Sequence, residues 1–159
     1  MKAVVTSEKR NPQGPDRRLF PRGGRRTSDQ PGRHPAITII ERYEGVRRPC
    51  VRYLEHFNFD VSEAGDPDEG VALLTVTRPA VVLLEDKKSA GFERLQRQAL
   101  TLSIPVVSMA TDFSNEDAAR KHVTYAAGVL LKPFSLGTML DEIRRVIRLA
   151  RTAVQGQEG

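Results

Sequence analysis

Carboxylates that follow two apolar runs of the sequence are the first candidates for chemistry. Glu85 and Asp86 come directly after VVLL (81–84), and Glu41 comes directly after AITII (36–40). An apolar run that passes straight into acidic residues is typical of a buried parallel strand, which delivers its last side chains to one edge of a sheet. The question is whether these carboxylates form a reactive site or are what remains of one.

The other residue types that commonly carry chemistry form no comparable pattern. Cys50 is the single cysteine, so no disulfide can form within the chain, and its helical spacing from Leu54 predicts a buried thiol. His34, His56 and His122 have no cysteine or acid at the spacing of a metal site. Neither a glycine-rich phosphate loop nor a serine elbow is present. We predict no catalytic residue, no metal site and no cofactor.

The elements that must position the carboxylates are predicted from apolar periodicity. The predicted strands are 36–40, 59–64, 80–84, 105–110 and 128–131. The predicted helices are 44–57, 66 to just before Pro79, 92–102, 114 to about 123, and 135 to about 150. Asp66, Pro67 and Glu69 form a strong helix start, and Ser135 is the expected cap of the last helix.

Strands that alternate with helices over about 115 residues predict a parallel sheet with helices on both faces. The expected fold is α/β, a flavodoxin-like doubly wound five-stranded sheet in the order 2-1-3-4-5. In such sheets, sites form beyond the carboxyl ends of the strands, where the strand order switches between the first and third strands. Glu41 and Glu85 are predicted to lie at this switch.

The basic character of the chain is concentrated at its start. Residues 1–34 hold nine Lys or Arg and three acids, a net charge of +6, whereas the other 125 residues have a net charge of −1. Frequent Pro and Gly predict a disordered basic tail over 1–34, followed by a folded domain over 35–153 and a short tail over 154–159. No apolar run is long enough to span a membrane, and a cytoplasmic location is expected.

The domain from Ala36 to about Arg151 resembles a receiver domain of bacterial two-component response regulators. The resemblance rests on IIERYEGVRR (39–48), PAVVLLED (79–86), IPVVSMAT (104–111) and GVLLKPFS (128–135). It implies an aspartate acceptor for a phosphoryl group after the third strand and an acidic pair that holds Mg²⁺ after the first. It also implies a hydroxyl after the fourth strand and a lysine in a Lys-Pro pair after the fifth.

This sequence departs from the family pattern at most of these positions. Glu85 stands where the aspartate is expected, and its longer side chain moves the carboxylate by roughly 1.5 Å. Misplacement by ~1 Å can cost ~100-fold in rate. Arg42 stands in the acidic pair beside Glu41, where it removes an oxygen ligand that Mg²⁺ requires. Ala110 stands in place of the hydroxyl, and only Lys132 is retained.

These departures predict a pseudo-receiver, a single-domain and non-enzymatic signalling module that keeps the fold without the phosphorelay. Arg42 and Lys132 are expected to balance Glu41 and Glu85 in an ion cluster of zero net charge. The alternative of unrelated surface charges at the strand ends stays open. Asp86 is an alternative phosphoacceptor, although neighbouring strand residues face opposite ways. An atypical phosphorylatable receiver and a nucleic-acid-binding protein that acts through its basic tail are the competing functions.

The resemblance also implies a face for partner proteins, formed by the fourth helix, the fifth strand and the fifth helix. Expected partners are a histidine kinase, another response regulator or a second copy of the chain, with an anionic partner for the tail. No output domain follows Gly159 in this sequence, so transcription-factor activity through an attached DNA-binding domain is not expected. The residues predicted on this face are Ala118, Ala119, Val129, Arg144, Arg145 and Arg148.

Overall fold

A parallel sheet of five strands forms the centre of the domain in the computed structural model, which describes residues 35–111 and 126–157. The strands are β1 (Ala36–Ile40), β2 (Asp60–Ala64), β3 (Val81–Glu85), β4 (Val106–Ala110) and β5 (Gly128–Leu131). Their order is β2-β1-β3-β4-β5 and every pair is parallel. The predicted fold class and strand order are confirmed.

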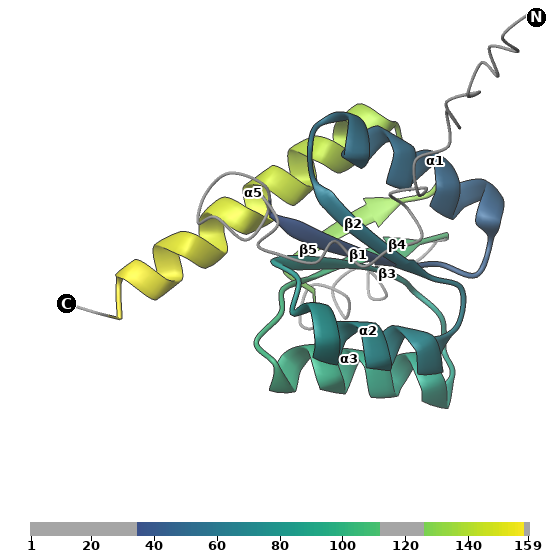
Figure 1. The fold of residues 1–159 in the computed structure, drawn as a ribbon, viewed down its shortest axis with the longest axis horizontal. Coiled ribbons are helices and arrows are strands. Elements are labelled where there is room, and N and C mark those ends of the chain that lie inside the picture. Colours follow the sequence, from purple (N-terminus) through teal and green to yellow (C-terminus); the bar gives the residue numbers. More distant parts are fainter. Residues whose placement is uncertain (1–34, 112–125, 158–159) are drawn as a thin grey trace, which may run out of the picture.

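The helices cover the two faces of the sheet in separate pairs (Figure 1). α1 (Glu44–His56) and α5 (Leu136–Gln155) lie on one face, and α2 (Pro67–Thr77) and α3 (Ala90–Thr101) lie on the other. The helix predicted over 114–123 and the tail predicted over 1–34 lie outside the described residues. No helix in the described ranges is long and apolar enough to cross a membrane.

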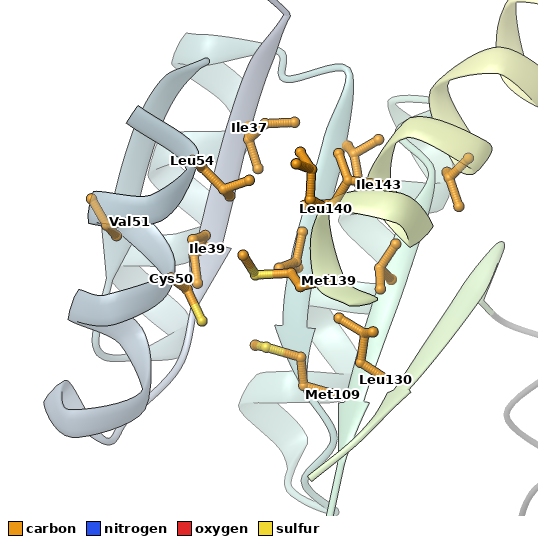
Figure 2. Packing of buried hydrophobic residues seen from close by; sticks show 14 of the residues in the cluster. Ile37, Ile39, Cys50, Val51, Leu54, Met109, Leu130, Met139, Leu140 and Ile143 are labelled. Atoms are coloured by element: carbon orange, nitrogen blue, oxygen red, sulfur yellow. The ribbon is translucent and has the colours of Figure 1, made fainter. Parts of the chain in front are cut away.

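Each face of the sheet has its own apolar core, which explains why the central strands contain almost no polar residues. On the α1 and α5 side, Ile37 and Ile39 of β1 contact Leu54 of α1 and Met139 and Ile143 of α5 (Figure 2). On the other side, the core joins β1 and β3 to α2 and α3. Strands buried on both faces bury the most apolar area per residue, which is the main stabilising term for a domain of this size.

Side-chain caps begin three of the helices. Asp66 accepts a hydrogen bond of 2.9 Å from the backbone N–H of Glu69, and Pro67 occupies the first position of α2. Ser135 accepts a 3.0 Å bond from the N–H of Thr138 at the start of α5, and Ser89 caps α3 in the same way. The predicted helix starts at 66 and 135 are therefore confirmed by the bonds that cause them.

Several local details differ from the sequence analysis. The helix predicted over 44–57 ends one residue earlier, at His56, and Phe57 is 39% exposed although its apolar spacing would place it on the buried face. β3 extends one residue beyond the predicted range and includes Glu85. Pro49 lies inside α1, which continues to His56. Cys50 is buried as predicted, and burial raises the pKa of its thiol from 9.0 to about 11.

Candidate functional site

The predicted site residues come together at the carboxyl edge of the sheet. Glu85 is the last residue of β3, Ala110 is the last residue of β4, Glu41 directly follows β1, and Lys132 directly follows β5. Because β1, β3, β4 and β5 are adjacent and parallel, their carboxyl ends lie at the same edge. Glu41 and Glu85 are buried there, with exposed fractions of 0% and 4%.

Arg42 binds the carboxylate of Glu85 through two nitrogens. Its Nη2 donates to Oε1 at 2.8 Å, and its Nε lies 3.1 Å from Oε1 and 3.0 Å from Oε2. The backbone N–H of Arg42 donates to Oε2 at 3.2 Å. Both oxygens of Glu85 are therefore engaged by a single residue that lies 43 positions earlier in the chain.

The pKa of Glu85 reflects two opposed effects. Burial disfavours the ionised carboxylate and raises its pKa, whereas the hydrogen bonds and the positive charge of Arg42 lower it. The interactions with Arg42 prevail, so the pKa of Glu85 lies below its ordinary value and the side chain is ionised at neutral pH. The hydrogen bond to Glu85 raises the pKa of the Arg42 guanidinium in turn.

Glu41 forms the second half of the site with Lys132. The Lys132 Nζ donates to Oε2 of Glu41 at 2.6 Å, and the backbone N–H of Tyr43 donates to Oε1 at 3.1 Å. The Lys132 side chain is 13% exposed and Glu41 is fully buried. The structure thus arranges the four charges as two ion pairs, Arg42 with Glu85 and Lys132 with Glu41, as the ion-cluster hypothesis predicted.

Arg47 takes part in the site although the sequence analysis did not single it out. Its Nη1 donates to the backbone carbonyl of Glu41 at 2.7 Å, and its Nε donates to Glu63 of β2 at 3.2 Å. Arg47 therefore ties the turn after β1 to the neighbouring strand. The available signal was an arginine one turn into the helix that follows the site strand, but nothing in the sequence shows that it turns back.

The remaining predicted site residues have less specific positions. Ala110 is 1% exposed, and its carbonyl accepts the backbone N–H of Lys132 at 2.8 Å. Thr111 follows it in an exposed position. Asp86 is half-buried, and its backbone N–H donates to the carbonyl of Met109 at 2.8 Å. The alternative acceptor role of Asp86 stays a prediction.

The carboxylates of this site do not fit a Mg²⁺ ion. Mg²⁺ requires oxygen ligands in near-octahedral geometry. All four carboxylate oxygens of Glu41 and Glu85 already accept hydrogen bonds from Arg42, Tyr43 and Lys132. Within residues 35–111 and 126–157, no group of three or more His, Cys, Asp or Glu side chains could hold a metal ion.

The predicted partner face is described only in part. Ala118 and Ala119 lie outside the described residues. Val129 is half-buried in β5, whereas Arg144 and Arg148 of α5 are exposed. Arg145 pairs with Glu142 one turn earlier on the helix and donates to the carbonyl of Ala127.

Comparisons with known proteins bear on the fold of this domain. No family model matches the sequence. The phosphate regulon transcriptional regulatory protein PhoB of Klebsiella pneumoniae is 31% identical over 117 residues, which are 70% of this chain and 51% of that protein. The DNA-binding dual master transcriptional regulator RpaA of Synechocystis sp. is 29% identical over 119 residues, 72% of this chain and 49% of that protein. The chain therefore spans about half the length of the curated relatives it matches.

Solved structures show the same fold at lower identity. A CheY-like response regulator receiver domain from Methanospirillum hungatei matches with a TM-score of 0.66 and 18% identity, over 76% of this chain and 98% of that one. Chemotaxis protein CheY4 of Vibrio cholerae matches with a TM-score of 0.62 and 22% identity, over 71% of this chain and 98% of that one. The fold is that of a CheY-like receiver domain. The similarity to PhoB and RpaA covers this same domain and agrees with a response regulator receiver fold.

Proposed function

We propose that this protein is a non-enzymatic signalling module, a pseudo-receiver that acts through protein–protein contacts in a two-component-type pathway. The observation that carries the proposal is the double contact of Arg42 with Glu85. The carboxylate at the phosphoacceptor position is held by a permanent cation on both of its oxygens.

Phosphoryl transfer to Glu85 would require three things that these side chains do not supply. One carboxylate oxygen must be free for in-line attack, but Arg42 engages both. A divalent cation must neutralise the transferred group, and the oxygens that would bind it are occupied. A hydroxyl donor must contact the phosphoryl oxygens, and Ala110 has none.

The two ion pairs also favour a single conformation of the domain, because a conformation that separates them would leave buried charges unpaired. The charges of Arg42, Lys132, Glu41 and Glu85 sum to zero, and each buried carboxylate has a cation within hydrogen-bond distance. A buried pair that loses one member leaves an uncompensated charge, so a state that separates the pairs is costly. In this proposal, partners such as a kinase, another regulator or a second copy bind a surface that phosphorylation does not switch.

Phosphorylation with radiolabelled acetyl phosphate and Mg²⁺ tests the proposal directly. We expect no stable label on this protein under conditions that label a phosphorylatable receiver domain, used as the positive control. A stable label that disappears in Glu85→Gln or in a variant of Asp86 would contradict the proposal and favour an atypical phosphorylatable receiver.

A variant that carries the residues of a phosphorylatable receiver at three positions serves as the control. It shows whether the same scaffold can bind Mg²⁺ under the same conditions. Arg42→Asp, Glu85→Asp and Ala110→Thr together return the acidic pair, the acceptor and the hydroxyl that the resemblance implies. We expect this triple variant to bind Mg²⁺, measured by titration calorimetry, while the unaltered protein shows no binding heat. Mg²⁺ binding by the unaltered protein at the same concentration would count against the proposal.

A further inference from the structure

The outer edge of β2 is an open edge of the sheet in the described part of the chain. β2 is the first strand in the sheet order, so among the described strands only β1 pairs with it. The N–H of Asp60 bonds to the residue before β1, and the C=O of Ala64 bonds to the residue after it. Alternate residues of a parallel strand bond to the same neighbour. The N–H and C=O groups of Val61 and Glu63 therefore point away from the sheet.

β2 lacks the features that usually prevent an edge strand from pairing. Its sequence, DVSEA, contains neither proline nor lysine, and its register with β1 runs without a bulge. The charge of Glu63 is offset within the chain, because Arg47 lies 3.2 Å and Arg48 lies 3.3 Å from its carboxylate oxygens. Another strand can therefore add to this edge without meeting an unpaired charge at Glu63.

An exposed apolar side chain of α2 lies on the same side of the domain. Val76 is 81% exposed. Thr75 of α2 accepts a hydrogen bond from Gln98 of α3 and so marks the side of α2 that faces α3. Val76 and Leu73 lie about 100° and 160° around the helix from Thr75, on the side turned away from α3. Because α3 connects β3 to β4, that side of α2 borders the β2 edge.

The last turn of α2 lies at the level of the middle of β2. Thr77 Oγ1 lies 3.4 Å from Thr38 Oγ1 of β1, and Thr38 pairs in register with Ser62. Ser62 is the third of the five residues of β2. Val76, the neighbour of Thr77, is therefore close to the level of Ser62 along the strand.

We propose that the β2 edge binds a second copy of this chain, through antiparallel pairing of the two β2 strands about a twofold axis at Ser62. In this register Val61 lies opposite Glu63 of the second copy, and the outward N–H and C=O groups of these residues exchange hydrogen bonds. Ser62 lies opposite itself, in a pair without backbone hydrogen bonds. A register centred on Glu63 would place two carboxylates opposite each other, which is unfavourable.

The same axis brings the ends of the two α2 helices together. α2 packs over β1 and β2. Because neighbouring strands are about 4.8 Å apart, α2 of the second copy lies about 10 Å away, which is the usual distance between packed helices. Val76 is close to the level of the axis, so it packs against Val76 of the second copy. The pairing thus covers an apolar side chain that is exposed in the single chain.

The α1 helices meet on the opposite face of the sheet, and their charges permit this. Arg48 contacts Glu63, so the side of α1 that holds Arg48 borders the β2 edge. The exposed charged residues on this side are spaced by four, four and three residues, and they are Glu44, Arg48, Arg52 and Glu55. Their charges sum to zero, so the second copy does not present a surface of a single sign.

A single extended segment of another protein fits these features less well than a second copy. Such a segment could bond to Val61 and Glu63, but it would bring no helix to cover Val76. A second copy supplies a strand and a helix together, at the spacing that this chain presents. Each contact also occurs twice, because the interface is symmetric.

Sedimentation equilibrium of the full chain between about 1 and 300 µM tests the inference. We expect the unaltered protein to form a dimer in this range. Val76→Lys places like charges across the axis without altering a buried residue, and it should raise the dissociation constant at least about tenfold. Leu100→Lys is the matched control, because Leu100 is 80% exposed and is likewise the next-to-last residue of its helix, α3. It should keep the constant within about twofold of the unaltered protein.

Cysteine cross-linking tests the register. Ser62→Cys places two thiols at the axis, where the Cα–Cα separation of about 4.5 Å suits a disulfide. Mild oxidation should give a covalent dimer of Ser62→Cys but not of Thr101→Cys, which alters an exposed residue of α3. Cys50 is buried and should not cross-link in either variant.

Three results would each overturn the inference. They are a monomer over the whole concentration range, equal weakening by Val76→Lys and Leu100→Lys, and no covalent dimer of Ser62→Cys. None of them depends on the state of Glu85, so they leave the proposed function untouched.

Discussion

At the scale of single residues, the site is defined by which donor reaches which carboxylate. Glu41 is fully buried and Glu85 nearly so, and each has one cation and one backbone N–H as partners. Burying an ionised carboxylate is costly unless the charge is paired and its oxygens are satisfied. Within the described residues, no buried side-chain nitrogen or oxygen lacks a hydrogen-bond partner.

Replacing Lys132 should therefore destabilise the fold. Lys132→Met removes the cation from a carboxylate that has no access to solvent, and we expect the free energy of unfolding to fall by about 3 kcal/mol. Urea denaturation measures the change, and Lys88→Met, at an exposed position, should stay within about 0.5 kcal/mol of the unaltered protein. Adding Glu41→Gln to Lys132→Met should recover part of the loss, because a neutral amide needs no counter-ion. No loss in the single variant would show that the pair is not formed.

Glu85 should make the stability depend on pH in the acid range. Its pKa in the folded protein lies below the ordinary value of 4.5, so the unfolded chain takes up the proton first as the pH falls. The stabilising contribution of Glu85 is therefore complete above pH 4.5 and is lost as the pH falls through the lower folded pKa. The difference in unfolding free energy between the unaltered protein and Glu85→Gln should shrink between pH 6 and pH 3. A constant difference over that range would contradict the prediction.

The coupling of Arg42 with Glu85 can be measured separately. Arg42→Ala leaves Glu85 buried without its cation, and Glu85→Gln leaves Arg42 without its anion. The loss of stability in the double variant should be smaller than the sum of the two single losses, because the second change removes nothing that the first has left intact. Additive losses in denaturation would show that the two side chains are unrelated surface charges.

At the scale of elements, close packing of the first turns of α2 and α3 depends on a glycine. A Cβ atom at Gly91, the second residue of α3, would lie 2.8 Å from Cβ and Cγ of Pro67, the first residue of α2. The proline ring cannot rotate away as a flexible side chain would. α2 and α3 could then accommodate the atom only by moving apart over the core that they share.

Two alanine substitutions at equivalent helix positions test this packing. Gly91→Ala should lower the free energy of unfolding by about 1 to 3 kcal/mol because of overpacking against Pro67. Gly137 is the second residue of α5, and a Cβ there would have no neighbour closer than 4.0 Å. Gly137→Ala should leave the stability unchanged or raise it by up to about 1 kcal/mol, through the lower chain entropy of alanine in the unfolded state. Equal effects at the two positions, measured by thermal unfolding, would contradict the packing argument.

At the scale of the whole molecule, the domain divides into a rigid centre and peripheral parts. β1, β3 and β4 lie in the middle of the sheet, with almost every residue buried, whereas β2 is half-buried at one edge. α5 extends from the core at Met139 to turns after Arg148 in which every described residue but the half-buried Ala150 is exposed. The receiver-like fold is thus held together mainly by the central strands and the helices that cover them.

Amide hydrogen exchange should show the same division. The backbone hydrogen bonds of β1, β3 and β4 should break only with global unfolding, so the amides of these strands should exchange most slowly. Amides of the last two turns of α5 should exchange at least ~100-fold faster, because local fraying exposes no core residue there. Exchange of the helix end at the rate of the central strands would indicate that it packs against something in solution, such as a second copy.

Features of this protein that depend on residues close together in the sequence could be predicted from it, whereas contacts between residues far apart in the sequence could not. The strands at 36–40 and 128–131 and the helix starts at Asp66 and Ser135 follow from neighbouring residues, because apolar periodicity and caps act over a few positions. The alternation of elements and the right-handed crossover rule predicted a parallel sheet covered on both faces, and the order 2-1-3-4-5 was chosen as a common doubly wound order at this length. The departures at Glu85 and Arg42 could also be read directly once the family resemblance placed them.

Only the tertiary structure decided which charges meet. Arg42 binds Glu85 rather than its neighbour Glu41, Lys132 reaches Glu41 across 91 residues, and Arg47 turns back to the carbonyl of Glu41. Equally, Phe57 fits the apolar spacing of α1 yet lies exposed under Arg144, because the helix ends one residue before it. Periodicity is a property of one element, whereas these contacts depend on the relative positions of several, which exist only after the sheet and helices have packed together.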